Sequence, residues 1–148
     1  MASLGRYILA ALALAAVLCG IVVAVYLAGP GRGDAKSDLS RPKKSAHGLF
    51  VVSLMPESGA IKTGVLQSWL LTLKTASGSP VEFAAIDISG GRPRQAHGLP
   101  TSPQATDYLG QGRYRVEGLK FTVSGWWQLR LAISAAAGSD TVVFNVVL

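Results

Sequence analysis

A single uncharged apolar run, residues 7–28, constrains this chain more than any other feature. Its 22 residues contain neither a charge nor a proline, and 21 of them are apolar. As a helix rising about 1.5 Å per residue, the run would extend about 33 Å, enough to cross a hydrocarbon core of about 30 Å. The run therefore predicts one transmembrane helix, preceded by an N-terminal tail at residues 1–6.

A cleaved signal peptide is the alternative to a permanent anchor. Arg6 precedes the run, as a basic residue does in signal peptides, but the run exceeds their usual length of roughly 7–15 apolar residues. The sequence Tyr26-Leu27-Ala28 would also place a bulky tyrosine three residues before a cut. We therefore expect an uncleaved signal anchor that crosses the membrane once.

Small residues recur every four positions along the predicted span, at Ala16, Gly20, Ala24 and Ala28. Such a stripe allows two helices to approach closely in lipid and would support weak homo-association through the anchor. An alanine-rich helix also shows this spacing by chance, and both interpretations stay open.

The basic charge gathers beside the membrane span. The net charge is +6, and residues 29–46 carry five basic and two acidic side chains, whereas residues 47–148 carry eight basic and six acidic ones. Residues 29–46 are small and polar and predict a flexible linker, either attracted to anionic lipid headgroups or simply solvated. The nearly neutral domain after it lacks the basic footprint of a nucleic-acid binder.

The orientation of the span is left open by its flanking charges. Only Arg6 precedes the run, whereas five basic residues follow it. Counted alone, these charges would place the C-terminal domain in the cytoplasm. Long domains translocate largely regardless of charge, so an extracytoplasmic domain is still expected.

Residues 47–148 show the alternation typical of β-strands and no sustained helical stripe. Turn residues such as Gly90-Gly91 and Gly110-Gln111-Gly112 separate the apolar runs. The runs are Leu49–Met55, Ser68–Thr75, Val81–Ile88, Arg113–Leu119, Trp126–Ile133 and Thr141–Leu148. This pattern predicts an all-β fold, an immunoglobulin-like β-sandwich of about seven strands.

Two aromatic features refine this expectation. The segment 107–114 is similar to a tyrosine corner with Tyr114 as its ring. Trp126 and Trp127 are neighbours on one strand and must point to opposite faces, so one should be core. The other, Trp126 if it lies outside, would be a candidate partner contact, although edge-covering packing is the commoner role.

Chemical motifs are sparse. No Gly-x-Ser-x-Gly elbow, phosphate loop or Cys-x-x-Cys pair is present, and the lone cysteine lies in the predicted span. His47 stands at the start of the domain, fifty residues from His97. The sequence therefore favours a non-enzymatic protein without a cofactor.

One loop, residues 90–103, has the composition of a binding loop. It is rich in proline and glycine, and loops on rigid scaffolds commonly carry binding residues. Its candidate contacts are Arg92, Arg94, His97, Gly98 and Pro100. His97 could ligate a metal, but a lone histidine is more often a hydrogen-bonded loop residue.

The segments HGLPTSP, LGQGRYRVEGLKF, SGWWQLRL and DTVVFNVVL resemble the FixH/YtkA-like family of bacterial envelope β-sandwich proteins. The resemblance implies a domain anchored to the bacterial inner membrane and facing the periplasm. It also implies a soft-metal site of His and Met residues, copper above all. Here Gln67, Arg92, Gln95 and Val123 stand at four of those positions, and only His97 remains.

Together these observations predict a membrane-anchored extracytoplasmic domain that binds another envelope protein or assists assembly of an envelope or respiratory complex. The alternative is a copper-handling module with a degenerate site at His97, with Gln67 and Gln95 as weak neighbours.

Overall fold

The computed structural model describes residues 37–39, 41–93, 95 and 98–148. Within these residues the regular structure is entirely β, which confirms the all-β part of the prediction, with eight strands where about seven were expected. The strands are β1 (Lys43–Lys44), β2 (Phe50–Pro56), β3 (Gln67–Thr75), β4 (Ala85–Gly91), β5 (Gln104–Gly110), β6 (Arg113–Leu119), β7 (Trp126–Ala135) and β8 (Gly138–Val147). The predicted span and its four small residues lie outside the described part, in which no helix has the length and apolarity to cross a membrane.

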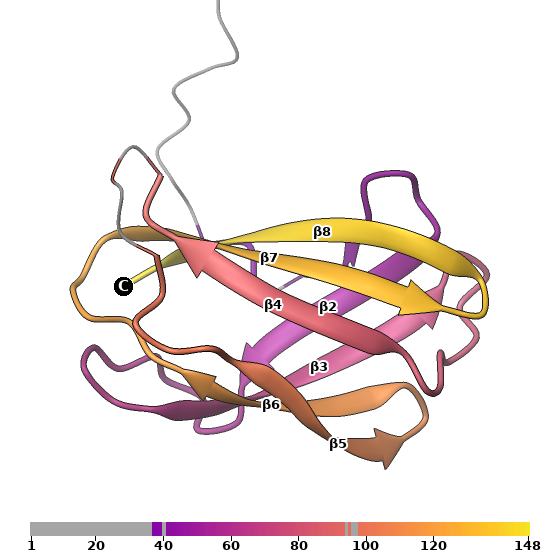
Figure 1. Ribbon diagram of the computed structural model, residues 1–148, viewed down its shortest axis with the longest axis horizontal. Coiled ribbons are helices and arrows are strands. Elements are labelled where there is room, and N and C mark those ends of the chain that lie inside the picture. Colours follow the sequence, from indigo (N-terminus) through magenta and orange to yellow (C-terminus); the bar gives the residue numbers. More distant parts are fainter. Residues whose placement is uncertain (1–36, 40, 94, 96–97) are drawn as a thin grey trace, which may run out of the picture. The chain divides into compact units, whose positions relative to one another are not determined.

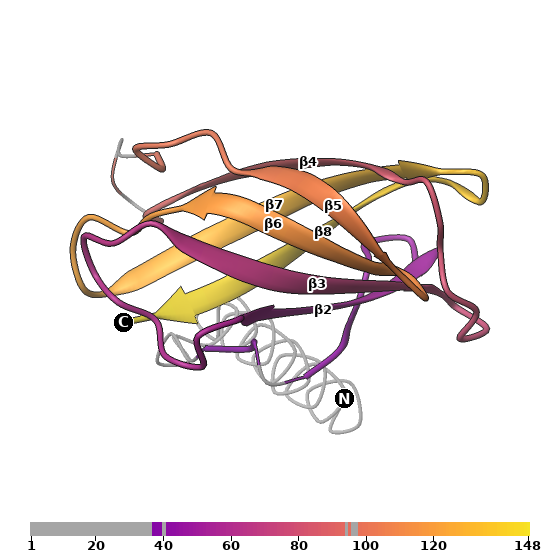
Figure 2. The same cartoon turned by 90° about the horizontal axis from the view of Figure 1, so that it is seen from below.

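The eight strands form one hydrogen-bonded series in the order β1-β2-β3-β6-β5-β4-β7-β8, and all neighbours are antiparallel. Figures 1 and 2 show this sheet doubled over on itself, with β2, β3 and β6 in one layer and β4, β7 and β8 in the other. A single residue pair, Asp87 with Gln104, joins β4 to β5 where the sheet passes between layers. The two layers bury a common core.

The core follows from the alternation in the sequence. The inward residues of both layers form one buried cluster. Its fully buried members include Trp69 of β3, Trp127 of β7 and Phe121, which lies in the connection between β6 and β7. The Phe121 ring lies between the two indoles, with centroids 6.1 Å from Trp69 and 5.4 Å from Trp127. Trp126 is only half-buried on the opposite face, which confirms that the adjacent tryptophans divide between core and exterior.

The strand predicted at Val81–Ile88 begins later, at Ala85. Phe83 adopts a φ of 53°, which an extended strand does not tolerate, and the chain kinks there. The kink is held by the Tyr114 hydroxyl, which donates to the Val81 carbonyl (2.8 Å) and accepts from the Ala84 amide (3.1 Å). Tyr114 therefore ties β6 to the start of β4, about thirty residues away, instead of closing a local corner.

Sequence reasoning also missed β5, which occupies part of the segment read as a tyrosine corner. No residue of β5 is buried, so the strand has no apolar alternation to reveal it. The local tyrosine contact belongs to Tyr108, whose hydroxyl accepts from the Gly112 amide at 3.2 Å. Gln111 and Gly112 turn the chain into β6 with φ values of 54° and 70°.

The last part of the predicted linker is packed against the domain. We call residues 37–39 and 41–46 the strap. Its strand β1 pairs with β2, while its Asp38 and Ala46 amides donate to β8 carbonyls, those of Asn145 (3.1 Å) and Thr141 (2.8 Å). The Lys43 ammonium also donates to the Val143 carbonyl at 2.6 Å. The strap thus lies between the two edges of the series.

The two buried tryptophans differ in one respect. The Trp127 indole N–H donates to the Val123 carbonyl at 3.0 Å, whereas the Trp69 indole N–H has no partner among the described residues. A buried donor left unpaired costs about 1–3 kcal/mol.

We expect Trp69→Phe to destabilise the protein less than Trp127→Phe, by about 1 kcal/mol, because the first removes an unpaired donor and the second leaves a carbonyl without its donor. Urea unfolding of the two variants beside the parent measures this difference. An equal or larger loss for Trp69→Phe would contradict it.

Candidate functional site

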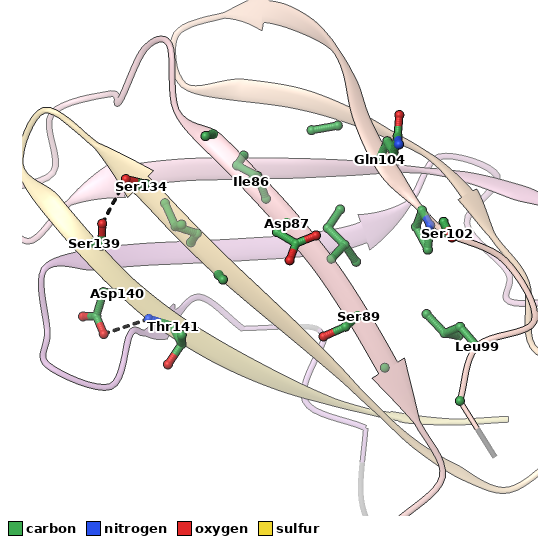
Figure 3. Close-up of a pocket in the computed structure, with 18 of the residues that line it drawn as sticks. Ile86, Asp87, Ser89, Leu99, Ser102, Gln104, Ser134, Ser139, Asp140 and Thr141 are labelled. Carbon is green, nitrogen blue, oxygen red and sulfur yellow. Dashed lines mark hydrogen bonds between the residues drawn. The ribbon is translucent and has the colours of Figure 1, made fainter. Parts of the chain in front are cut away.

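A trough of about 960 Å³ lies on the outer face of β4, β7 and β8. Figure 3 shows its lining spread from Ser139 and Thr141 on one side to Ser102 and Leu99 on the other, with Asp87 between them. We call this hollow the trough throughout. Of the features predicted from the sequence, the loop at residues 90–103 contributes to this lining, at Gly90, Gly98, Leu99, Thr101, Ser102 and Pro103.

The floor of the trough is made of short side chains brought into register by antiparallel pairing. Ala132 of β7 pairs with Asp87 of β4 and with Thr141 of β8. One pleat further along, Ser134 pairs with Ala85 and Ser139, and its hydroxyl lies 2.9 Å from that of Ser139. Because outward residues line up across paired strands, six short side chains share one face. They leave room for an occupant close to the backbone.

The wall beside β4 is the returning chain at residues 98–105. The Leu99 amide donates to the Gly90 carbonyl at 3.0 Å, and the Thr101 hydroxyl donates to the Gly118 carbonyl at 2.5 Å. Leu99 packs over Gly90, where an added Cβ would meet the Gln128 carbonyl at 2.6 Å and the Leu99 side chain at 3.2 Å. Position 90 therefore requires glycine mainly because β7 passes so close to it, and the wall residue Leu99 lies only slightly further away.

At the opposite end, Asp140 fixes the start of the domain to β8. Its buried carboxylate accepts from the backbone amides of His47 (3.0 Å), Leu49 (3.3 Å) and Thr141 (2.8 Å), and it lies 3.0 Å from His47 Nδ1. Burial opposes ionisation, but hydrogen bonds from Ser45, Thr141 and His47 outweigh it and hold the pKa of Asp140 well below its usual range. The His47 side chain remains 81% exposed at the trough rim.

The predicted binding loop contributes only its base to the trough. Gly98 lines it and bridges to Gly91, whereas Pro100 is exposed outside the lining. Arg92 is half-buried beside Gly125. Gln95 is exposed, and its backbone N–H donates to the Arg92 carbonyl at 3.1 Å. Arg94 and His97 lie outside the described residues.

Gln67, one of the predicted weak metal neighbours, is buried at the start of β3 with its amide fully engaged. Its oxygen accepts from the Lys62 amide at 2.9 Å, and its nitrogen donates to the Ala60 carbonyl (2.8 Å) and the Ser58 hydroxyl (3.1 Å). These bonds close the 58–62 turn. Nowhere in the described ranges do three or more His, Cys, Asp or Glu side chains gather as a metal site would require.

Trp126, the predicted partner contact, shares the outer face but lies beyond the trough. Its indole N–H donates to the Asn145 side-chain oxygen at 3.0 Å, which also accepts from Gln128 at 3.1 Å. The Asn145 amide nitrogen in turn donates to Asp38 of the strap at 3.1 Å. In this position Trp126 covers the junction between strap and β8.

Sequence reasoning missed Asp87, Asp140 and the short floor residues. A signal was present, since Ala132, Ser134, Ser139 and Thr141 occupy the alternate positions of β7 and β8 that oppose the core residues. To predict that these residues form one floor, the register in which β4, β7 and β8 pair must be known. A single sequence does not determine that register.

A family model described as YtkA-like matches residues 47–132, more than half of the chain. No curated protein and no solved structure matches the chain.

We expect Asp140→Asn to lower the melting temperature at neutral pH, because the ionised carboxylate that accepts three backbone amides is lost. Since its pKa is lowered by folding, Asp140 stabilises the folded protein above about pH 4, and this contribution fades as the pH falls through the folded pKa. Thermal melts from pH 7 to pH 2 should therefore show a gap between parent and variant that narrows in acid. A gap that stays constant would contradict the assignment, and His47→Ala, which keeps the carboxylate, serves as the control.

Proposed function

Because the chain belongs to the YtkA-like family, we propose that it is a non-enzymatic domain, anchored in the bacterial inner membrane and facing the periplasm, that binds a partner protein through the trough. The anchor would be the predicted span at residues 7–28, and the partner another envelope protein, such as a subunit of a respiratory complex during assembly. The family match supports an extracytoplasmic β domain.

The trough is the observation that carries this proposal. It is open along a sheet face, its floor residues are short, and it includes apolar surface from Ile86, Ile88 and Leu99. Binding surfaces combine such concave apolar surface with a few polar groups. The rigid strands beneath would keep the shape of the trough fixed when a partner docks.

We expect Ala132→Trp to prevent docking, because a large ring on the exposed floor position fills the trough. In cells that lack the native chain, full-length parent and variant would be compared by the amount of assembled respiratory complexes on native gels. Lys74→Trp, at an exposed outward position of β3 in the other layer, is the matched control.

The proposal requires that Ala132→Trp reduces assembled complexes at unchanged protein level and melting temperature, while Lys74→Trp does not. Normal assembly with a filled trough would overturn the proposed function.

Copper handling around His97 is the second candidate. The family resemblance implies a soft-metal site, but the replacements at Gln67, Arg92, Gln95 and Val123 argue that metal binding is weakened or lost in this chain. The amide of Gln67 is committed to the 58–62 turn, which leaves fewer donors for such a site. Transition-metal sites need several converging ligands. We therefore expect the full chain in detergent to bind Cu(I) and Cu(II) with dissociation constants no lower than about micromolar. Submicromolar binding that disappears in His97→Ala would establish the copper function instead.

A further inference from the structure

The trough has a local charge opposite to that of the whole chain. The net charge of the protein is +6. Among the described residues that line the trough, two are aspartates, one is a histidine, and none is lysine or arginine. A partner drawn by complementary charge would therefore present a cation here.

Asp87 is the carboxylate available to such a partner. The other carboxylate, Asp140, is buried and already accepts the backbone amides described above. Asp87 is exposed on the outer face, and its side chain makes no hydrogen bond or ion pair with any described residue. Figure 3 shows it near the centre of the trough, between the hydroxyl-bearing side and the wall.

The shape of the lining indicates an extended occupant. Every residue from Ala85 to Gly90 lines the trough, although successive residues of a strand point to opposite faces. Because the hollow is lined by inward-pointing and outward-pointing residues of β4 alike, it must run along the edge of that strand. Between Ala85 and Ser89 that edge has one residue pair with β5, against seven pairs between β4 and β7 on the other side. At Gly90 and Gly91 the edge is already occupied by the wall, through the bond from the Leu99 amide and the bridge to Gly98. Extended peptides bind at such edges, with backbone contacts for affinity and alternate side chains for specificity.

Arg130 limits where the cation can lie. It pairs with Ser89, one pleat along from the Asp87–Ala132 pair, and lines a smaller hollow that also includes Arg92 and Gln128. A basic side chain placed there would be repelled. The outer face therefore offers one acidic position next to a basic one, which fixes the register of a bound segment.

We propose that the trough takes an extended segment of a partner protein along the edge of β4, with a lysine or arginine of that segment paired to Asp87. This inference rests on the proposed function, since it names the chemistry of the partner that the trough binds. The segment needs about five residues to follow residues 85–89, at about 3.3 Å per residue, since the Gly90 carbonyl already accepts from the Leu99 amide.

The test uses the full chain in nanodiscs of phosphatidylcholine, whose neutral surface does not attract the probe. The probe is a fluorescent eight-residue peptide of alternating lysine and valine, compared with the glutamate–valine peptide by anisotropy. We expect the lysine peptide alone to bind, with affinity that falls as salt is raised.

Two substitutions should move the affinity in opposite directions. Asp87→Asn should weaken binding, and Arg130→Gln should strengthen it, each by about two- to fivefold, the range of an exposed ion pair. The matched controls Glu82→Gln and Lys74→Gln make the same charge changes at exposed positions outside the trough and should leave the affinity unchanged.

Hydrogen exchange of the parent complex supplies a measurement independent of any variant, with protection expected at residues 85–89 and 101–105. Equal binding of both peptides, equal effects of Asp87→Asn and Glu82→Gln, or protection elsewhere would overturn the inference. These results are separate from the cellular assay of Ala132→Trp, because peptide binding is measured on the isolated protein. Failure of that assay with a positive titration would reject the assembly role but keep the basic-peptide site.

Discussion

A sheet that doubles over on itself still has two edge strands, and their backbone amides and carbonyls need partners. In this domain the edges are β8 at one end of the series and β2, extended by the two-residue β1, at the other. The strap satisfies both, since it pairs with β2 and donates to the carbonyls of Thr141, Val143 and Asn145. Covering edges in this way protects a β protein from pairing with other chains.

The junction between β4 and β5, in the middle of the strand series, is covered in a different way. There the chain passes from β4 to β5 through the 98–105 wall, and the two strands share a single residue pair. The wall is held by bonds to Gly90 and Gly118 and by the close contact of Leu99 with Gly90. The strap covers the edges of β2 and β8, whereas the wall covers the edge of β4 only at Gly90 and Gly91. The rest of that edge, at residues 85–89, has one pair with β5 and lies beside short side chains and the carboxylate of Asp87.

Much of the fold could be predicted because β3, β7 and β8 bury every second residue, including Trp69, Trp127 and Phe144, while the residues between them are half-buried or exposed. The errors have equally physical causes. β5 buries no side chain and so carries no period, and Phe83 places a kink where the sequence continues smoothly into β4. The candidate site was least predictable, because Asp87, Ala132 and Thr141 meet only through strand register. The pairing of strands that are distant in the chain places these residues side by side, and local sequence does not encode that pairing.

The strap has a consequence for the order in which the domain can form. Its hydrogen bonds join residues separated by about a hundred positions, such as Lys43 with Val143 and Asp38 with Asn145. A chain made from its N-terminus therefore presents the strap and the β2 edge long before β8 exists to receive them. Closing so long a loop is slow, and pairing of this kind dominates the folding time of β proteins. During synthesis the incomplete sheet would expose its edges, so β8 completes the core and its protection in the same step.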